Sequence, residues 1–146
     1  MEVQRADFSI STDPSRLDIP LIHHYLCNHS YWAAGIPEET VRAAVDGALC
    51  FGVFHEQRQI GFARVISDYA TIAYLGDVFI LPEYRGRGLS KWLMEVVAGH
   101  PALQGLRRWI LATADAHGLY ARYGFQSLAR PERWMEKHDP DVYRSK

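Results

Sequence analysis

The chain has 146 residues, of which 48% are hydrophobic and 23% charged, and this composition is typical of one soluble globular domain spanning residues 1–146. The formal net charge of −1 excludes a global positive field, and no apolar stretch approaches the roughly 20 residues that cross a bilayer, so we expect neither a nucleic-acid nor a membrane partner. The two cysteines lack C-x-x-C spacing and the N-terminus lacks a signal-peptide profile, which predicts a cytoplasmic protein with reduced thiols.

Hydrophobic periodicity predicts the elements in chain order. Apolar and polar residues alternate near the N-terminus, as in a strand, and Leu17, Leu21 and Tyr25 then recur at helical spacing. Three strand-like runs separated by short turns follow, which predicts an antiparallel meander. After Pro82, apolar residues at i, i+3, i+4, i+7 and i+8 predict a helix with one apolar face. We therefore expect strands over 7–11, 49–55, 59–67, 71–81, 109–113, 126–129 and 133–136, and helices over 16–27, 37–47, 88–99 and 115–123.

This order of elements, β-α-α-β-β-β-α-β-α-β-β, predicts a mixed sheet with helices on both faces. The stretch CNHSYWAAGIP, residues 27–37, joins the first two helices as a loop. No internal repeat, low-complexity tract or linker interrupts the pattern, so we expect no domain boundary.

The stretch LPEYRGRGLSKWLMEVV, residues 81–97, places a glycine–arginine turn between a strand and a helix. The N-terminus of a helix offers unpaired N–H groups and the positive end of its dipole, and glycines let the chain come close to a bound group. The turn therefore predicts a cradle for a pyrophosphate, and the alternative is a solvated helix cap whose arginines point to water. A Walker A loop is excluded because Trp92 follows Lys91, and a dinucleotide fingerprint needs a third glycine at position 91.

Two motifs carry a resemblance to a known family. The turn resembles the acyl-CoA-binding motif of the GNAT superfamily of N-acetyltransferases, whose core [QR]-x-x-G-x-[GA] is matched by Arg85, Gly88 and Ser90. Ser90 departs from the usual Gly or Ala, which implies slightly altered packing against the phosphates. The later stretch LYARYGF, residues 119–125, resembles the Y-x-x-x-G-F pattern of the same superfamily and contains Tyr120.

The resemblance covers about residues 7–136 and implies a GNAT-type α/β (α+β) fold, with a central mixed, mostly antiparallel sheet of about six or seven strands flanked by helices on both faces. It implies acetyl-CoA as co-substrate, no metal, and a small-molecule amine or peptide amine as acceptor. A homodimer is common among relatives, although no residue pattern specifies an interface. The resemblance places the CoA ester on the turn and on the main chain of the preceding strand, at Val78, Phe79, Ile80, Arg85, Gly86, Arg87, Gly88, Leu89, Ser90 and Lys91.

The resemblance makes Tyr120 the general acid that protonates the departing CoA thiolate. The assignment is chemically reasonable, because a thiol has a pKa of about 8.5 and a tyrosine of about 10, so a nearby tyrosine delivers the proton at modest cost. Tyr123, or no side-chain acid at all, are the alternatives.

A protonated amine cannot attack a thioester, so the reaction also needs a route for proton removal. Asp77 is the candidate general base because it comes just before the acyl-binding segment, although regular strand alternation places it on the opposite face and only a local bulge changes that. The alternatives are His117, which is one turn from Tyr120, the pair His23–His24, or pairing of Asp77 with an arginine. Asp115 is interpreted as a helix cap.

We expect Tyr31, Trp32 and His117 to bind the acceptor, because aromatic rings beside small residues suit an amine through cation–π contact. The alternative is a loop that only covers the core. The sequence thus predicts an acetyl-CoA-dependent N-acetyltransferase that works by direct attack, with proximity supplying much of the acceleration. A non-catalytic acyl-CoA-binding or sensing module is the alternative, and a nucleotide- or nucleic-acid-binding domain is disfavoured by the net charge.

Overall fold

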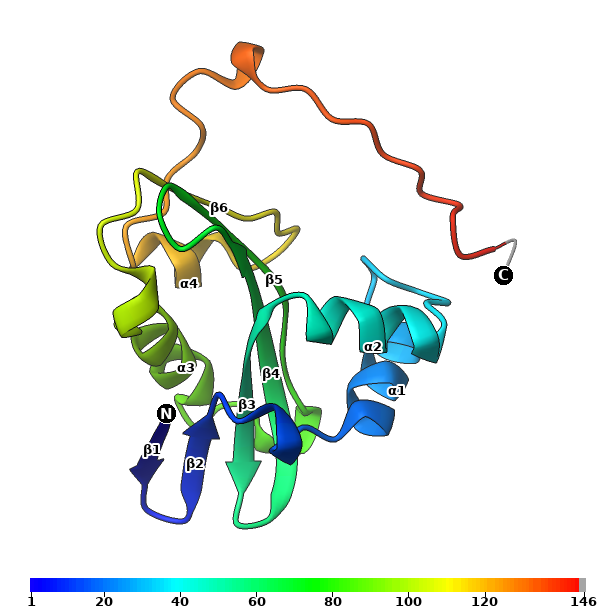
Figure 1. Cartoon of the computed structure of the whole chain (residues 1–146), viewed down its shortest axis with the longest axis vertical. Helices are drawn as coiled ribbons and strands as arrows, with labels where there is room; N and C mark the ends of the chain where they lie inside the picture. Colours follow the sequence, from blue (N-terminus) through cyan, green and yellow to red (C-terminus); the bar gives the residue numbers. More distant parts are fainter. Residues whose placement is uncertain (145–146) are drawn as a thin grey trace.

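The computed structural model describes residues 1–144 and centres on a six-stranded sheet (Figure 1). Neighbouring strands follow chain order, and every neighbouring pair is antiparallel except β5 and β6, which are parallel. The predicted mixed, mostly antiparallel sheet is thereby confirmed. The strands are β1 (Glu2–Arg5), β2 (Phe8–Ser11), β3 (Leu49–His55), β4 (Arg58–Ser67), β5 (Ile72–Ile80) and β6 (Arg108–Ile110), and the helices are α1 (Ile19–His29), α2 (Glu38–Asp46), α3 (Leu89–Ala98) and α4 (His117–Ala121).

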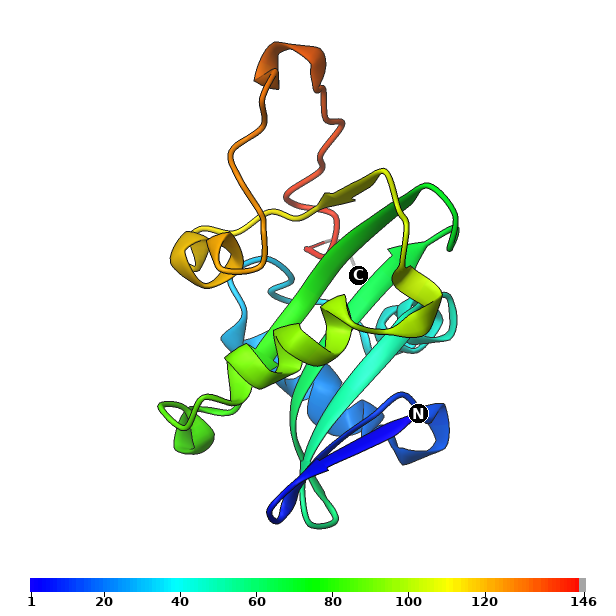
Figure 2. The same ribbon diagram turned by 90° about the vertical axis from the view of Figure 1, so that its left-hand side faces the viewer.

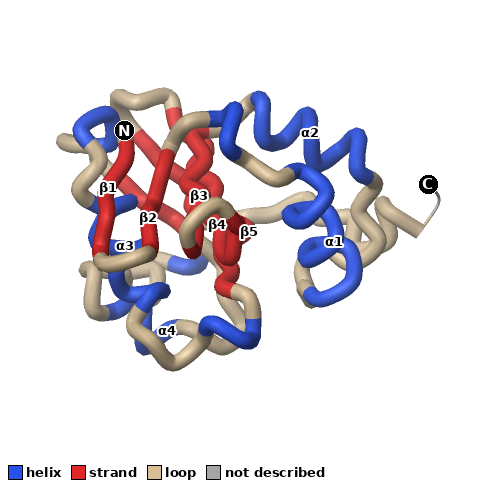
Figure 3. Tube along the Cα trace, turned by 90° about the horizontal axis from the view of Figure 1, so that it is seen from below, coloured by secondary structure: helices blue, strands red, loops and turns tan. Residues whose placement is uncertain are grey.

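Helices lie on both faces of the sheet. α1 and α2 are on one side and α3 and α4 on the other (Figures 1 and 3), and Figure 2 looks onto the face that α3 crosses. The apolar stripe predicted for α3 faces the sheet, and its buried side chains include Trp92, Leu93 and Val97. Phe51 of β3 and Phe62 of β4 are fully buried beneath the helices. Among the described residues, none of the helices has the length and apolar character needed to cross a bilayer.

The two ends of the chain differ from the prediction. Residues 2–5 form β1, a strand that periodicity did not reveal because three of its four residues are exposed. The strands predicted over 126–129 and 133–136 are absent, since Pro131 begins a short 3-10 turn and the segment arches from α4 over to the side of α1 (Figure 1). That prediction was wrong because alternation produces a strand only where a neighbouring strand can pair with it.

A β-bulge interrupts β5 next to the site. Phe62 pairs with Phe79 and Arg64 pairs with Gly76, so two residues of β5 lie opposite the single residue between them on β4. Asp77 is the first of the two and has φ of 54°, a left-handed value that few residues adopt. Regular strand alternation predicts that Asp77 and Val78 face opposite sides of the sheet, and the bulge makes that prediction wrong. Asp77 and Val78 both line one cavity.

Candidate active site

The glycine–arginine turn presents a row of backbone N–H groups. Gly86 and Gly88 have φ of 82° and 76°, and a Cβ atom built on either would meet no other atom within 4 Å. None of the amides of residues 86–91 donates to an acceptor within the part of the chain that the structure describes, and Gly88 caps α3 without a side-chain hydrogen bond. Open space in front of free N–H groups at a helix N-terminus fits a pyrophosphate.

Arg85 ties this turn to the body of the protein. Its Nε donates to the carbonyl oxygen of Ile80 at 2.9 Å, and its guanidinium donates to the hydroxyl of Tyr25 on α1 at 2.8 Å. The Tyr25 ring in turn stacks on Phe79, with centroids 4.0 Å apart. The side chain of Arg85 therefore holds the turn in shape and is not directed freely at an anion. The guanidinium of Arg87 lies 5.3 Å from the ring centroid of Tyr84.

Strands β5 and β6 separate after Tyr74, six residues before the end of β5 at Ile80. They pair only at Ile72↔Arg108, Ala73↔Trp109 and Tyr74↔Ile110. Beyond Tyr74, no described strand pairs with this edge of β5, so the main chain up to Ile80 is available on that side apart from the Ile80 carbonyl oxygen, which accepts from Arg85. A cavity of about 870 Å³ opens there, between β4 and β5, the loop between α1 and α2, and the segment 111–116.

Tyr120 is brought to this cavity by α4. Its side chain is only 8% exposed and its ring packs edge-on against Phe125, with centroids 6.0 Å apart. The Tyr120 hydroxyl has no hydrogen-bond partner among the described residues, yet no buried polar side-chain atom is left unsatisfied, so this oxygen is accessible from the cavity. Burial, with smaller contributions from Tyr31 and Asp115, raises the pKa of Tyr120 to about 12. The hydroxyl of Tyr123, the alternative acid, donates to the carbonyl oxygen of Lys91 at 2.8 Å.

Asp77 is the centre of a polar network in the same cavity. One carboxylate oxygen accepts from Trp32 Nε1 at 2.8 Å, and the other accepts from Arg64 Nε at 2.8 Å. The side chains of Arg64 and Asp77 are only 18% and 12% exposed, so this ion pair is largely removed from water. The pairing of Asp77 with an arginine, one of the expected alternatives, therefore occurs. Arg64 was not singled out in the sequence, although an arginine inside the apolar run GFARV is an unusual residue for a buried strand.

Tyr31 and Trp32 form one wall of the cavity. Their rings meet edge to face with centroids 5.0 Å apart, and the Tyr31 hydroxyl accepts a hydrogen bond from the Ala114 N–H at 2.7 Å. Although 59% and 41% of their surfaces are exposed, both line the cavity. The loop thus contacts the segment before α4 across the opening.

The expected histidines lie elsewhere. His117 is the exposed first residue of α4 and does not line the cavity, because this helix begins two residues later than predicted. His23 Nε2 is 2.9 Å from the carbonyl oxygen of Ile36, and His24 Nδ1 is 3.1 Å from Asn28 Nδ2.

The cap assignment for Asp115 was also wrong. Ala116 is the N-cap of α4, and its N–H donates to Thr113 Oγ1 at 3.1 Å. Asp115 instead lines the cavity.

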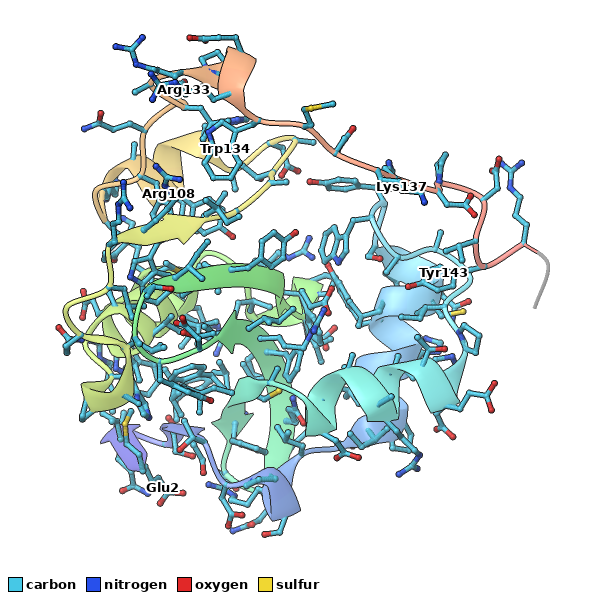
Figure 4. The ribbon with its side chains drawn as sticks, turned by 45° about the horizontal axis from the view of Figure 1, so that its top comes forward. Glu2, Arg108, Arg133, Trp134, Lys137 and Tyr143 are labelled. Carbon is cyan, nitrogen blue, oxygen red and sulfur yellow. The ribbon has the colours of Figure 1, made fainter. Side chains whose placement is uncertain are left out.

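The C-terminal segment also contributes a part of the cavity. The cavity is also lined by residues 136–138, Pro140 and Tyr143. Figure 4 shows Lys137 and Tyr143 on the segment that passes over to α1. Tyr143 packs close to Gly35, where an added Cβ would lie 3.7 Å from the Tyr143 Cβ.

A model of the acetyltransferase (GNAT) domain matches residues 46–127, more than half of the chain. The chain belongs to the GNAT family. A Gibberella zeae protein named as an acetyltransferase is 33% identical over 140 residues, which cover 81% of this chain and 78% of that protein. The crystal structure of a GNAT-family protein from Xanthomonas campestris pv. campestris is 60% identical, with a TM-score of 0.91 over 93% of this chain and 96% of that one.

As a GNAT protein the chain is an acetyltransferase, and the family uses acetyl-CoA. A Clostridium acetobutylicum structure solved with acetyl-CoA has the same fold, with 16% identity and a TM-score of 0.64 over 94% of this chain and 96% of that one. Along β5, the cavity is lined by residues 74–78, the edge without a partner strand extends from Leu75 to Ile80, and the turn follows Ile80.

Proposed function

We propose that this GNAT acetyltransferase moves the acetyl group of acetyl-CoA to the primary amine of a small molecule or a peptide by direct attack, with Tyr120 as general acid. One observation carries the proposal. The side chain of Tyr120 is buried, but its hydroxyl is accessible from the cavity that the open edge of β5 also lines. Amine and thioester held together in this cavity would react without the entropy loss of a bimolecular encounter.

The turn and the strand before it would hold acetyl-CoA. The free N–H groups of residues 86–91 suit the pyrophosphate, with Arg87 adding positive charge beside them. The main chain of Val78, Phe79 and Ile80 would bind the acetyl-pantetheine arm along the edge that β6 leaves open. A backbone N–H of this segment would also polarise the thioester carbonyl.

Tyr120 would supply the proton that the leaving sulfur needs. With a pKa raised to about 12, its hydroxyl stays protonated throughout the physiological pH range. Such a hydroxyl is a weaker acid than an ordinary thiol, whose pKa is about 8.5. The proton would therefore cross only as negative charge builds on the departing sulfur.

Asp77 would receive the proton of the attacking amine, directly or through water. A carboxylate has about four lone-pair sites, and Trp32 and Arg64 occupy one on each oxygen, so sites remain for an amine. The same two bonds fix the orientation of the carboxylate. Tyr31 and Trp32 would contact the acceptor cation through their rings.

The decisive experiment is a single-turnover assay of wild type and Tyr120→Phe with acetyl-CoA and a panel of primary amines. We expect wild type to acetylate at least one amine and Tyr120→Phe to be about a hundredfold slower or worse, since a general acid contributes on that order. If both proteins bind acetyl-CoA but neither consumes it with any amine, the chain is an acyl-CoA-binding module. The cytoplasmic location and a homodimer remain further predictions.

A further inference from the structure

Four arginines surround a second hollow, at the end of the sheet where β6 begins. Its volume is about 640 Å³, and Arg107 and Arg108 line one side while Arg130, Arg133 and Trp134 line the other. We call this feature the arginine hollow. Figure 4 shows Arg108, Arg133 and Trp134 gathered in this part of the molecule.

The charges of the arginine hollow are not neutralised by the protein. Among the described residues, none of the four guanidinium groups makes an ion pair or a side-chain hydrogen bond, and no acidic side chain lines the hollow. Glu132 lies between two of them in sequence but is neither part of the lining nor ion-paired within residues 1–144. The whole chain has nearly equal numbers of basic and acidic residues, 16 and 17, yet these four arginines lie around one hollow without an acidic partner.

One of these cations is already held in position. The guanidinium carbon of Arg108 lies 4.8 Å from the ring centroid of Trp134, a cation–π contact that joins β6 to the C-terminal segment. Arginine presents a rigid fork of N–H donors that matches the oxygens of phosphate, and it holds its charge at any physiological pH. Four guanidinium groups around one hollow can neutralise several phosphate charges at once.

The arginine hollow is separate from the acetyl-CoA site. Arg108 pairs with Ile72 at the start of β5, whereas the glycine–arginine turn follows Ile80 at the end of the same strand. Nine residues of strand place the two ends on the order of 26 Å apart, at roughly 3.3 Å per residue. The hollow also lies outside the cavity that contains Tyr120.

We propose that the arginine hollow is a binding site for an oligophosphate group, that is, a ligand with two or more phosphates in a row. The number of unpaired guanidinium groups, the absence of lining acids and the preset Arg108–Trp134 contact together favour phosphate over a single carboxylate. The group could belong to a nucleotide or to inorganic polyphosphate, and this inference does not depend on the acceptor or on the roles proposed for Tyr120 and Asp77.

The test is calorimetric titration of the full chain with inorganic tripolyphosphate, in which variants of the hollow's arginines separate binding at the hollow from binding at the glycine–arginine turn. We expect one saturable site that weakens strongly between about 0.05 M and about 0.5 M salt. Arg130 and Arg133 lie on the segment outside the sheet, so Arg130→Gln and Arg133→Gln should leave the core intact. Each variant should weaken tripolyphosphate binding about tenfold. The matched control is Arg42→Gln on α2, whose exposed arginine pairs with Glu38 and should change affinity less than twofold.

A fluorescence titration gives an independent readout. Tripolyphosphate should change the emission of wild type but not of Trp134→Phe, which still binds it. ATP in place of tripolyphosphate distinguishes the sources, since added affinity indicates a nucleotide and equal affinity indicates the phosphates alone. The proposal is overturned if no binding occurs at millimolar tripolyphosphate, if Arg42→Gln is as damaging as the hollow variants, or if a polyglutamate peptide binds more tightly.

Discussion

At the scale of single residues, Asp77 combines an unusual backbone conformation with a carboxylate that accepts one hydrogen bond on each oxygen. Its φ of 54° suits asparagine better than most residues, so Asp77→Asn keeps the bulge and changes only the chemistry. The amide oxygen can still accept from Trp32, but the pair with Arg64 is lost and leaves a largely buried guanidinium uncompensated. We expect the free energy of unfolding to fall by about 3 kcal/mol and kcat by about a hundredfold or more.

The pH–rate profile and a second variant separate the two roles of Asp77. A general base gives an acidic limb that disappears in Asp77→Asn. Trp32→Phe removes the indole donor while leaving the pair with Arg64, so it should raise the acceptor KM and leave kcat near that of wild type. If both variants reduce kcat equally and neither alters the acidic limb, Asp77 positions the loop and is not the base.

At the scale of elements, the turn between β5 and α3 depends on glycine for two different reasons. Gly88→Ala places a methyl group in the space in front of the free amides, and it also forces a side chain into φ of 76°. The backbone effect costs about 1–2 kcal/mol of stability. The methyl group should additionally weaken CoA binding by about tenfold, which corresponds to about 1.4 kcal/mol, and calorimetry with CoA measures it.

Gly105→Ala isolates the backbone effect. Gly105 has φ of 73° and equally open surroundings, but it lies between α3 and β6, away from the turn. We expect it to lose similar stability in urea unfolding and to bind CoA like wild type. Equal CoA affinity in both variants would place the pyrophosphate somewhere other than Gly88.

Periodicity was most informative where one face of an element is buried. The bounds of the helix α3 and of the strands β3 and β4 were predicted within a residue or two. An element that buries one face has apolar residues, such as Trp92 and Phe62, at a regular spacing. A bulge at Asp77 was a possibility that the sequence could not decide, since a bulge arises from the register between two strands. The C-terminal segment was mispredicted for a related reason, because pairing depends on what lies beside a segment in space.

The same limit applies to the site. The motif around Gly88 and the motif around Tyr120 were visible because they combine glycines, charge and helix signals in a fixed order. The partners of Asp77, the tie between Arg85 and Tyr25, and the lining by Tyr143 join residues far apart in the chain. No local pattern encodes such contacts.

At the scale of the whole molecule, two buried groups make stability fall in alkaline solution. Burial raises the pKa of Cys50 from 9.0 to about 12 and that of Tyr120 from 10.0 to about 12. The unfolded chain therefore releases these protons first as pH rises, so it binds fewer protons than the native state between about pH 9 and pH 12. Stability contributed by the two protonated groups is fully present below pH 9 and is lost through that window.

Each group should add a slope of about −1.4 kcal/mol per pH unit to the free energy of unfolding, starting near pH 9 for Cys50 and near pH 10 for Tyr120. Urea unfolding at a series of alkaline pH values measures the slope. Tyr120→Phe removes one ionisable group from a site where the ring can stay, so its curve should run parallel to wild type up to about pH 10 and fall less steeply above it. Cys50→Ala should diverge about one unit earlier, because the unfolded thiol ionises before the phenol does. Curves that remain parallel over the whole window would mean that neither group is desolvated in the native state, and Tyr120 would then titrate as an ordinary phenol.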